Sequence, residues 1–117
     1  MNAESVRDFC LEQPHVTEDL PFGPETVVFR IGGKIFLLLS LDTEALSFNV
    51  KCDPERAEEL RERHPGVVRP GFHMNKKHWN TVEPKEGTSD SILKEWILHS
   101  YDLVRNSLPK KSRELLP

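Results

Sequence analysis

Long apolar segments are absent from this sequence of 117 residues. The longest unbroken apolar run is Ile35–Leu39, far shorter than the roughly 20 residues with which a helix spans a bilayer. The N-terminus also lacks a basic stretch followed by an apolar core, which argues against a secretory signal. We therefore expect a cytoplasmic protein with no membrane partner.

Cysteine is scarce as well, since only Cys10 and Cys52 occur. They are far apart and show no metal-ligand spacing. Cys10 falls on the apolar face of an expected helix, and Cys52 falls at the end of an expected strand. We expect two free thiols, as is usual in the cytoplasm.

The motifs of common enzyme classes are missing: there is no G-x-S-x-G, no P-loop and no G-x-G-x-x-G. Gly32-Gly33 is explained by a hairpin turn. His73 and His78 are five residues apart, and no carboxylate between residues 64 and 82 supports their imidazoles. The sequence therefore predicts a non-enzymatic protein with no catalytic residue, no metal site and no cofactor.

What the sequence does contain is typical of one globular domain, which we place at residues 1–117. Hydrophobic residues make up 37% and charged residues 30% of the chain. The net charge of −3 is unevenly distributed, because residues 1–50 hold three basic and eight acidic side chains whereas residues 51–117 hold thirteen and eleven. This balance argues against a general nucleic-acid binder but leaves a local one possible.

Hydrophobic periodicity and turn signals predict elements in the order α-β-β-β-α-β-β-α. Asn2, Asp53 followed by Pro54, and Ser89 or Asp90 are suitable residues to begin the three helices. The expected helices cover residues 2–13, 53–64 and 89–108, and the expected strands lie within residues 25–51 (three strands), at 67–68 and at 79–82. This order predicts an α+β fold: a two-layer sandwich of helices on an antiparallel five-stranded sheet.

The register of the three-strand meander follows from its turns. Gly32-Gly33 suits a two-residue hairpin, so Ile31 should pair with Lys34, and Leu41 should then pair with Leu46 across the next turn. The core face predicted from this register consists of Val28, Ile35, Leu37, Leu39, Leu41, Leu46, Phe48 and Val50. The other face should carry Val27, Phe29, Phe36, Leu38, Ser47, Asn49 and Lys51.

A basic and aromatic stretch stands out at residues 63–82, which contain two arginines and two lysines but no Asp or Glu. Lysine and arginine suit phosphate oxygens, and asparagine can contact phosphate or base edges. The candidate DNA contacts are Arg69, His73, Asn75, Lys76, Lys77, His78 and Trp79. Trp79 could stack on an unpaired base or belong to the core. Alternatively, the stretch is a solvated turn whose lysines keep the sheet edge from pairing with another chain.

Three segments resemble the MmcQ/YjbR family of small bacterial proteins: "FRIGGKIFLLL", "KCDPERAEELRERHPGVVRPGFHMNKKHWNTV" and "SYDLVRNSLPKKSRELL". The resemblance covers essentially the whole chain. It implies a two-layer fold of the type III secretion chaperone-like kind, a double-wing motif and DNA binding. The wings would be the hairpin at residues 70–83 and the turn Gly32-Gly33-Lys34.

The resemblance to secretion chaperones also leaves open a second function, the binding of a peptide or protein partner. The surface for it would be the mixed sheet face with Phe29, Phe36, Leu38, Ser47 and Asn49, unless the first helix covers that face. The sequence does not predict an oligomeric state. A further basic cluster, Lys110, Lys111 and Arg113, raises the question of whether it joins the mid-chain charges on one surface.

Overall fold

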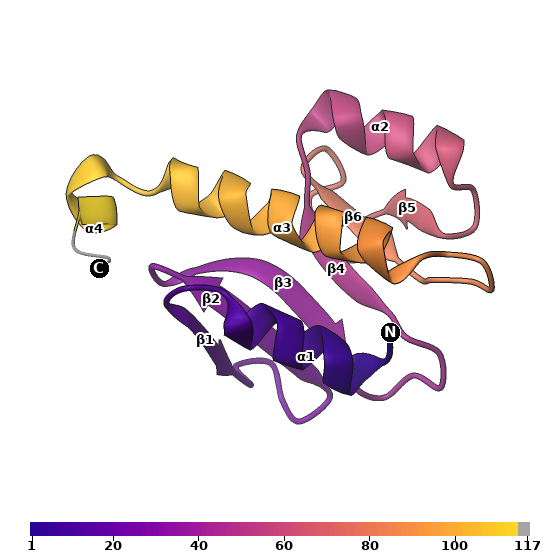
Figure 1. Ribbon diagram of the computed structural model, residues 1–117, viewed down its shortest axis with the longest axis horizontal. Helices are drawn as coiled ribbons and strands as arrows, with labels where there is room; N and C mark the ends of the chain where they lie inside the picture. Colours follow the sequence, from indigo (N-terminus) through magenta and orange to yellow (C-terminus); the bar gives the residue numbers. More distant parts are fainter. Residues whose placement is uncertain (115–117) are drawn as a thin grey trace.

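The computed structural model describes residues 1–114 and arranges them as helices on one side of a twisted sheet (Figure 1). The helices are α1 (Ala3–Glu12), α2 (Pro54–Arg63), α3 (Asp90–Ser107) and α4 (Lys110–Glu114). The strands are β1 (Val16–Asp19), β2 (Thr26–Ile31), β3 (Lys34–Ser40), β4 (Phe48–Lys51), β5 (Val68–Pro70) and β6 (Trp79–Val82). The α+β class is therefore confirmed.

The sheet has six strands in the order β1-β2-β3-β4-β6-β5, and every neighbouring pair is antiparallel. The sequence predicted five, because β1 lies between the first expected helix and the first expected strand, where no element was predicted. This edge strand is held by ion pairs on both of its faces, Arg7 with Glu18 and Arg30 with Asp19. Its short V-T-E-D sequence carries no strong strand signal of its own.

The predicted helix starts are confirmed. The side chain of Asn2 accepts a hydrogen bond from the backbone of Ser5, that of Asp53 from Glu55, and that of Ser89 from Ile92. These caps satisfy N–H groups that have no partner within the helix. Because each cap is encoded within a few residues, the starts of the helices could be predicted locally.

The first hairpin contains a β-bulge that the sequence did not predict. Ile31 pairs with Lys34 as expected, but Phe29 pairs with Leu37, because Phe36 is an extra residue on β3. Next to it, Val28 pairs with Leu38. The bulge therefore shifts the pairing by one residue and exchanges the faces of β2 relative to the prediction.

The observed core differs from the predicted one accordingly. Val28 and Ile35 lie on the face opposite the core, and Leu41 is 47% exposed. The side chains of the strands that do form the core are Val27, Phe29, Ile31, Phe36, Leu37, Leu39, Phe48, Val50, Val68 and Val82. The pairing across the second turn follows the predicted register, since Leu37 pairs with Val50 and Leu39 with Phe48.

The bulge is fixed to α3 by one buried side chain. Ser100 is fully buried, its hydroxyl donates to the backbone carbonyl of Phe36, and it accepts from the backbone N–H of Lys51 at 2.8 Å. The ring of Phe36 also packs edge-on against Tyr101, with ring centroids 5.4 Å apart. α3 thus positions the end of β4 as well as the bulge.

All three long helices lie on the core side of the sheet. Val6 and Cys10 of α1 pack into the same cluster as Trp96 and Ile97 of α3. Leu60 of α2 also packs against that cluster. The opposite face of the sheet, which carries Leu38, Asn49 and Thr81, is referred to below as the open face.

Candidate nucleic-acid interface

The predicted wing is a real hairpin, formed by β5, β6 and the loop at residues 71–78, which we call the wing loop. The backbone N–H of Gly71 donates to the carbonyl of Trp79 and extends the ladder by one residue. The side-chain oxygen of Asn75 accepts from the N–H of Lys77, and its carbonyl accepts from His78 and Trp79. Asn75 therefore shapes the loop, and its side-chain oxygen is already engaged.

The wing loop is fastened to α2 by Arg61, a residue that the sequence did not indicate. Its guanidinium donates to the side-chain oxygen of Asn80 at 2.8 Å and to the carbonyls of Lys76 and Trp79. A guanidinium has five N–H donors in a rigid fork, so one side chain can hold the second half of the loop and the start of β6 together. No local motif predicts such a contact, because it joins residues 15 to 19 positions apart.

The candidate residues differ in what they present to solvent. His73, Asn75, Lys76 and Lys77 are exposed, whereas His78 and Trp79 are half-buried. His73 adopts a left-handed backbone conformation with φ of 58°, which is unusual for a residue other than glycine. Such strained positions occur preferentially at functional sites.

Two of the four cations of the basic stretch are already paired with carboxylates. Arg69 forms an ion pair with Glu83, and Arg63 forms one with Glu59 at 2.8 Å. The sequence showed residues 63–82 to be free of acid, but β6 leads directly to Glu83 and the helix supplies Glu59. Any phosphate contact of Arg69 would therefore start from an existing ion pair, which the sequence did not indicate.

Lys76 and Lys77 differ from these arginines. Within residues 1–114, neither lysine forms an ion pair. Lys77 shares a shallow groove with Glu55 and Glu58 of α2, which lowers the local excess of positive charge without neutralising it directly.

Strand register brings further lysines to the same end of the sheet. Lys51 ends β4 and pairs with Trp79, the first residue of β6 after the wing loop. Lys34 begins β3 immediately after the Gly32-Gly33 turn. Because neighbouring strands are antiparallel, Lys34, Lys51 and the wing loop all lie at one end of the sheet, which we call the cationic end.

The C-terminal basic cluster reaches this end too. Leu108 packs directly over the β2–β3 turn, where a Cβ atom on Gly32 would lie 2.5 Å from Leu108 Cδ1. α4, which carries Lys110 and Lys111, follows at once and lies beside that turn in Figure 1. The mid-chain and C-terminal charges therefore share one end of the molecule.

Acidic side chains are concentrated in the helices that pack on the core side of the sheet. α1, α2 and α3 together carry ten acidic and six basic side chains, whereas the six strands carry two acidic and four basic ones. The wing loop adds Lys76 and Lys77 and no acid. A protein of negative net charge thus has a cationic end, which is the arrangement that attracts a polyanion.

The mixed sheet face expected to bind a peptide is not formed. Phe29 and Phe36 belong to the core because of the bulge, so only Leu38, Ser47 and Asn49 remain on the open face. Leu38 is only 8% exposed. The apolar surface that a bound peptide would cover is therefore lacking at these positions.

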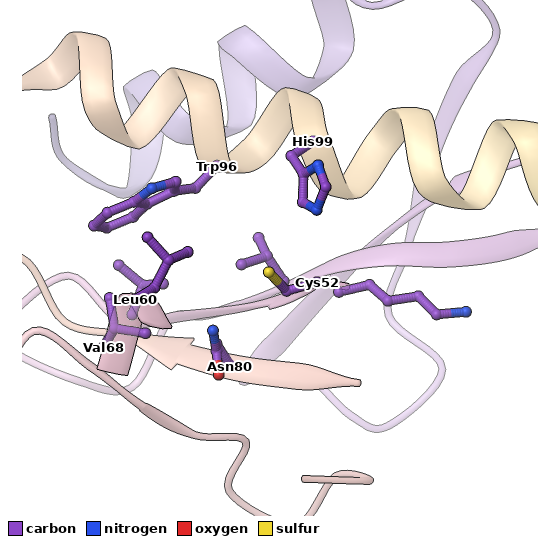
Figure 2. Close-up of a pocket in the computed structure, with 9 residues that line it drawn as sticks. Cys52, Leu60, Val68, Asn80, Trp96 and His99 are labelled. Carbon is purple, nitrogen blue, oxygen red and sulfur yellow. The ribbon is translucent and has the colours of Figure 1, made fainter. Parts of the chain in front are cut away.

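A small cavity lies between α2, α3 and the sheet, lined by Cys52, Leu60, Asn80, Trp96 and His99 among others (Figure 2). The oxygen of Asn80 faces Arg61, which can only donate, so the amide nitrogen points toward the space below Trp96 and His99. That nitrogen is buried and has no hydrogen-bond partner within residues 1–114. About 10 Å³ of the cavity is accessible to a water-sized sphere, which suits a single water molecule.

Two titratable groups of this cavity, Cys52 and His99, have pKa values shifted toward their neutral forms. Burial is the main cause that raises the pKa of the Cys52 thiol, and burial followed by the charge of Arg56 lowers the pKa of His99. A reactive cysteine needs a thiolate, which this environment disfavours. Cys10 is fully buried, and burial raises its pKa to about 12. Both cysteines are free thiols, as predicted.

The part of the chain that the structure describes contains neither a membrane-spanning helix nor a metal-binding cluster. No helix in residues 1–114 has the length and hydropathy needed to cross a bilayer. In the same residues, no three side chains among His, Cys, Asp and Glu come together in a way that could bind a metal ion.

Comparison with known proteins places this geometry among relatives. A family model described as YjbR matches residues 11–103. The uncharacterised protein YbdF of Escherichia coli O157:H7 is 40% identical over 111 residues, covering 95% of this chain and 90% of the relative. The uncharacterised protein YjbR of Escherichia coli K12 is 28% identical over 116 residues, covering 99% and 98%.

Solved structures agree with the fold. The crystal structure of Deinococcus radiodurans protein DR2400, with the domain DUF419, superposes with a TM-score of 0.92 at 38% identity, covering 98% of this chain and 87% of that one. A Pseudomonas syringae protein superposes with a TM-score of 0.75 at 25% identity, covering 89% and 99%. Neither name states an activity.

Proposed function

We propose that this chain, which belongs to the YjbR family, binds DNA through the cationic end of its sheet. The resemblance to that family implies the double-wing motif with which it would do so. The wings are the wing loop and the Gly32-Gly33 turn. The DNA ligands are Lys34, Lys51, Lys76 and Lys77, and the role is binding rather than catalysis.

The single observation that carries this proposal is the placement of these lysines. All four lie at one end of the sheet in a protein whose net charge is −3, and none of them forms an ion pair within residues 1–114. Lysine binds phosphate oxygens as a point charge and releases counterions from the backbone when it does so. Arg69 and Arg63 are left out of the ligand set because their carboxylate partners already engage them.

The spacing of the wings suits a duplex. The two turns are centred three strand positions apart, which corresponds to about 14 Å at about 4.8 Å per strand. The major groove of B-DNA is about 12 Å wide, so one wing can approach each phosphate backbone that borders it. Lys51, between the wings, then faces the groove.

A binding role without cofactor is the remaining part of the proposal, together with a cytoplasmic location. The shifts of the pKa values of Cys52 and His99 toward their neutral forms support it, since neither group is poised for nucleophilic or acid–base chemistry. The absence of an enzyme motif in the sequence points the same way.

Salt dependence and charge reversal test the proposal together. If four lysines contact phosphates, the logarithm of the affinity for duplex should fall with the logarithm of salt concentration at a slope of about −3.6. The affinity should then drop about a hundredfold between 50 and 200 mM salt. Reversal of two ligands, Lys76→Glu with Lys77→Glu, should abolish measurable binding in a fluorescence anisotropy titration.

A matched control is Lys85→Glu with Lys94→Glu, which changes the charge equally but at the opposite end of the sheet and on α3. This control should retain most of the affinity. Binding that ignores salt, or that the two double variants weaken equally, would show that the cationic end is not the site.

A further inference from the structure

We infer that the protein binds nucleic acid with unpaired nucleotides more tightly than a duplex, because one unpaired base stacks on Phe72 at the open face of the sheet in addition to the phosphate contacts of the lysines. This inference rests on the proposed function and deepens it, since it names the form of the nucleic acid. Three observations support it: the exposed side chain of Phe72 in the wing loop, the position of this residue at the open face, and the charges around it.

Phe72 is 64% exposed, which is far more than its large apolar ring would be if packing were its role. Its ring contacts that of His73, with centroids 4.0 Å apart and a tilt of 50°. The left-handed conformation of His73 turns the chain sharply at this point. Two adjacent rings are therefore presented to solvent at the start of the wing loop.

The wing loop crosses onto the open face at Phe72. The backbone N–H of Phe72 donates to the hydroxyl of Thr81 at 3.0 Å, and that hydroxyl donates to the side chain of Asn49. Thr81 pairs with both Asn49 and Arg69, which fixes these side chains on the open face. α1, α2 and α3 pack on the other side of the sheet, so none of them covers Phe72 and its neighbours on the open face, which we call the platform.

Trp79 lies on the same face, because it is two residues from Thr81 along β6, where it pairs with Lys51. Its Cβ atom lies against Gly71, where an added Cβ would approach it to 2.9 Å. Trp79 is half-buried and supports the wing loop from below. The aromatic surface offered to a ligand is therefore that of Phe72 and His73.

The charges around this platform suit a phosphate backbone. Lys51, Lys76 and Lys77 form no ion pair within residues 1–114, whereas the nearby carboxylate of Glu83 is occupied by Arg69. Single-stranded nucleic acids bind where a cationic track accompanies aromatic rings on which bases stack. A duplex hides the faces of its bases, so it would not use the ring of Phe72.

The test compares three fluorescein-labelled probes of about 12 nucleotides: a single strand, the same sequence as a duplex, and an abasic sugar-phosphate strand. The protein should bind the single strand at least about tenfold more tightly than the other two. Phe72→Ala should lower the affinity for the single strand about tenfold and leave the other two unchanged. Circular dichroism of the variant confirms that it is folded.

Two variants control for aromatic exposure and for stacking. Phe22→Ala removes an equally exposed ring, 67% accessible, from the β1–β2 loop and should leave all affinities unchanged. Phe72→Trp should keep the preference for the single strand, and its added fluorescence should be quenched on binding, relative to the same titration of the parent protein.

The outcomes separate this inference from the proposed function. Equal binding of all three probes, unaffected by Phe72→Ala but weakened by Lys76→Glu with Lys77→Glu, would overturn the inference and leave DNA binding by charge. Equal binding of an unstructured acidic peptide would also overturn it, because no base would then be needed. Affinity that is insensitive to the lysine reversals would overturn both.

Discussion

Arg61 shows how a single side chain can organise a site to which it contributes no ligand. In the sequence it is one of several charges on a polar helix, and nothing near it indicates a special role. In the structure it donates to Asn80 and to two carbonyls of the wing loop. The loop that carries Lys76 and Lys77 therefore depends on a cation that does not face the ligand.

Replacing Arg61 by methionine should lower the free energy of unfolding by about 2 kcal/mol, because the buried oxygen of Asn80 loses its donor and two carbonyls lose theirs. Urea denaturation measures this. The control is Arg63→Met, two residues further along α2, where the exposed ion pair of Arg63 with Glu59 is worth less than about 1 kcal/mol. Equal losses in the two variants would contradict the role assigned to Arg61.

His99 gives the protein a pH dependence of predictable sign. Burial and the charge of Arg56 lower its pKa below the ordinary 6.5, against the opposing pull of Asp53 and Asp102. As pH falls, the unfolded chain takes up the proton before the folded protein does. His99 therefore does not reduce the free energy of unfolding well above pH 6.5 and reduces it progressively below that value.

The variant His99→Gln should therefore lose less stability than the parent protein between pH 7 and pH 5. Urea titrations at both pH values give the difference, in which the contributions of the other titrating groups cancel. A variant that loses as much stability as the parent over this range would show that His99 does not titrate differently in the folded state.

Among the elements, those with local signals could be predicted and those set by distant partners could not. Asn2, Asp53 and Ser89 each encode a helix start within three residues, and Gly32-Gly33 encodes the first hairpin. The bulge at Phe36 has no such signal, because it is fixed by Ser100, 64 residues away. Missing it exchanged the two faces of β2 and produced a peptide-binding surface that does not exist.

The two glycines of the hairpin should respond differently to substitution. Both have positive φ, 58° at Gly32 and 81° at Gly33, so alanine at either position costs about 1 kcal/mol in backbone strain. Gly32→Ala should cost at least about 1 kcal/mol more, because its Cβ would clash with Leu108, whereas nothing lies within 4 Å of a Cβ at Gly33.

Thermal or urea unfolding of the two variants measures the difference. Adding Leu108→Ala to Gly32→Ala should recover part of the extra loss, since a double-mutant cycle isolates the contact between them. Identical stabilities of Gly32→Ala and Gly33→Ala would mean that α3 does not dock on the turn as described.

At the scale of the whole molecule, charge is separated in a way that composition conceals. The sequence revealed the excess of base in residues 63–82, but it could not show that Lys34 and Lys51 join the same end. Strand order and register decide that, and both depend on contacts between distant segments. It also could not show that Glu83 pairs with Arg69, an expected ligand, or that Glu59 pairs with Arg63 of the same basic stretch.

Despite its net charge of −3, the protein should be retained by immobilised heparin at neutral pH and low salt. Lys34→Glu with Lys51→Glu should abolish this retention, because it reverses one charge beside the first turn and one between the wings. The elution position on a salt gradient measures the effect. Passage of the parent protein without retention would contradict the charge separation described here.

The attachment of the wing has a consequence for local motion. β5 is a three-residue edge strand, and the only fully buried side chain of α2 is that of Ala57. β3, by contrast, lies inside the sheet and buries four consecutive side chains. Amide protons of α2 and β5 should therefore exchange with deuterium well before those of β3. A bound oligonucleotide should slow the exchange of α2 and β5 before that of the rest of the protein.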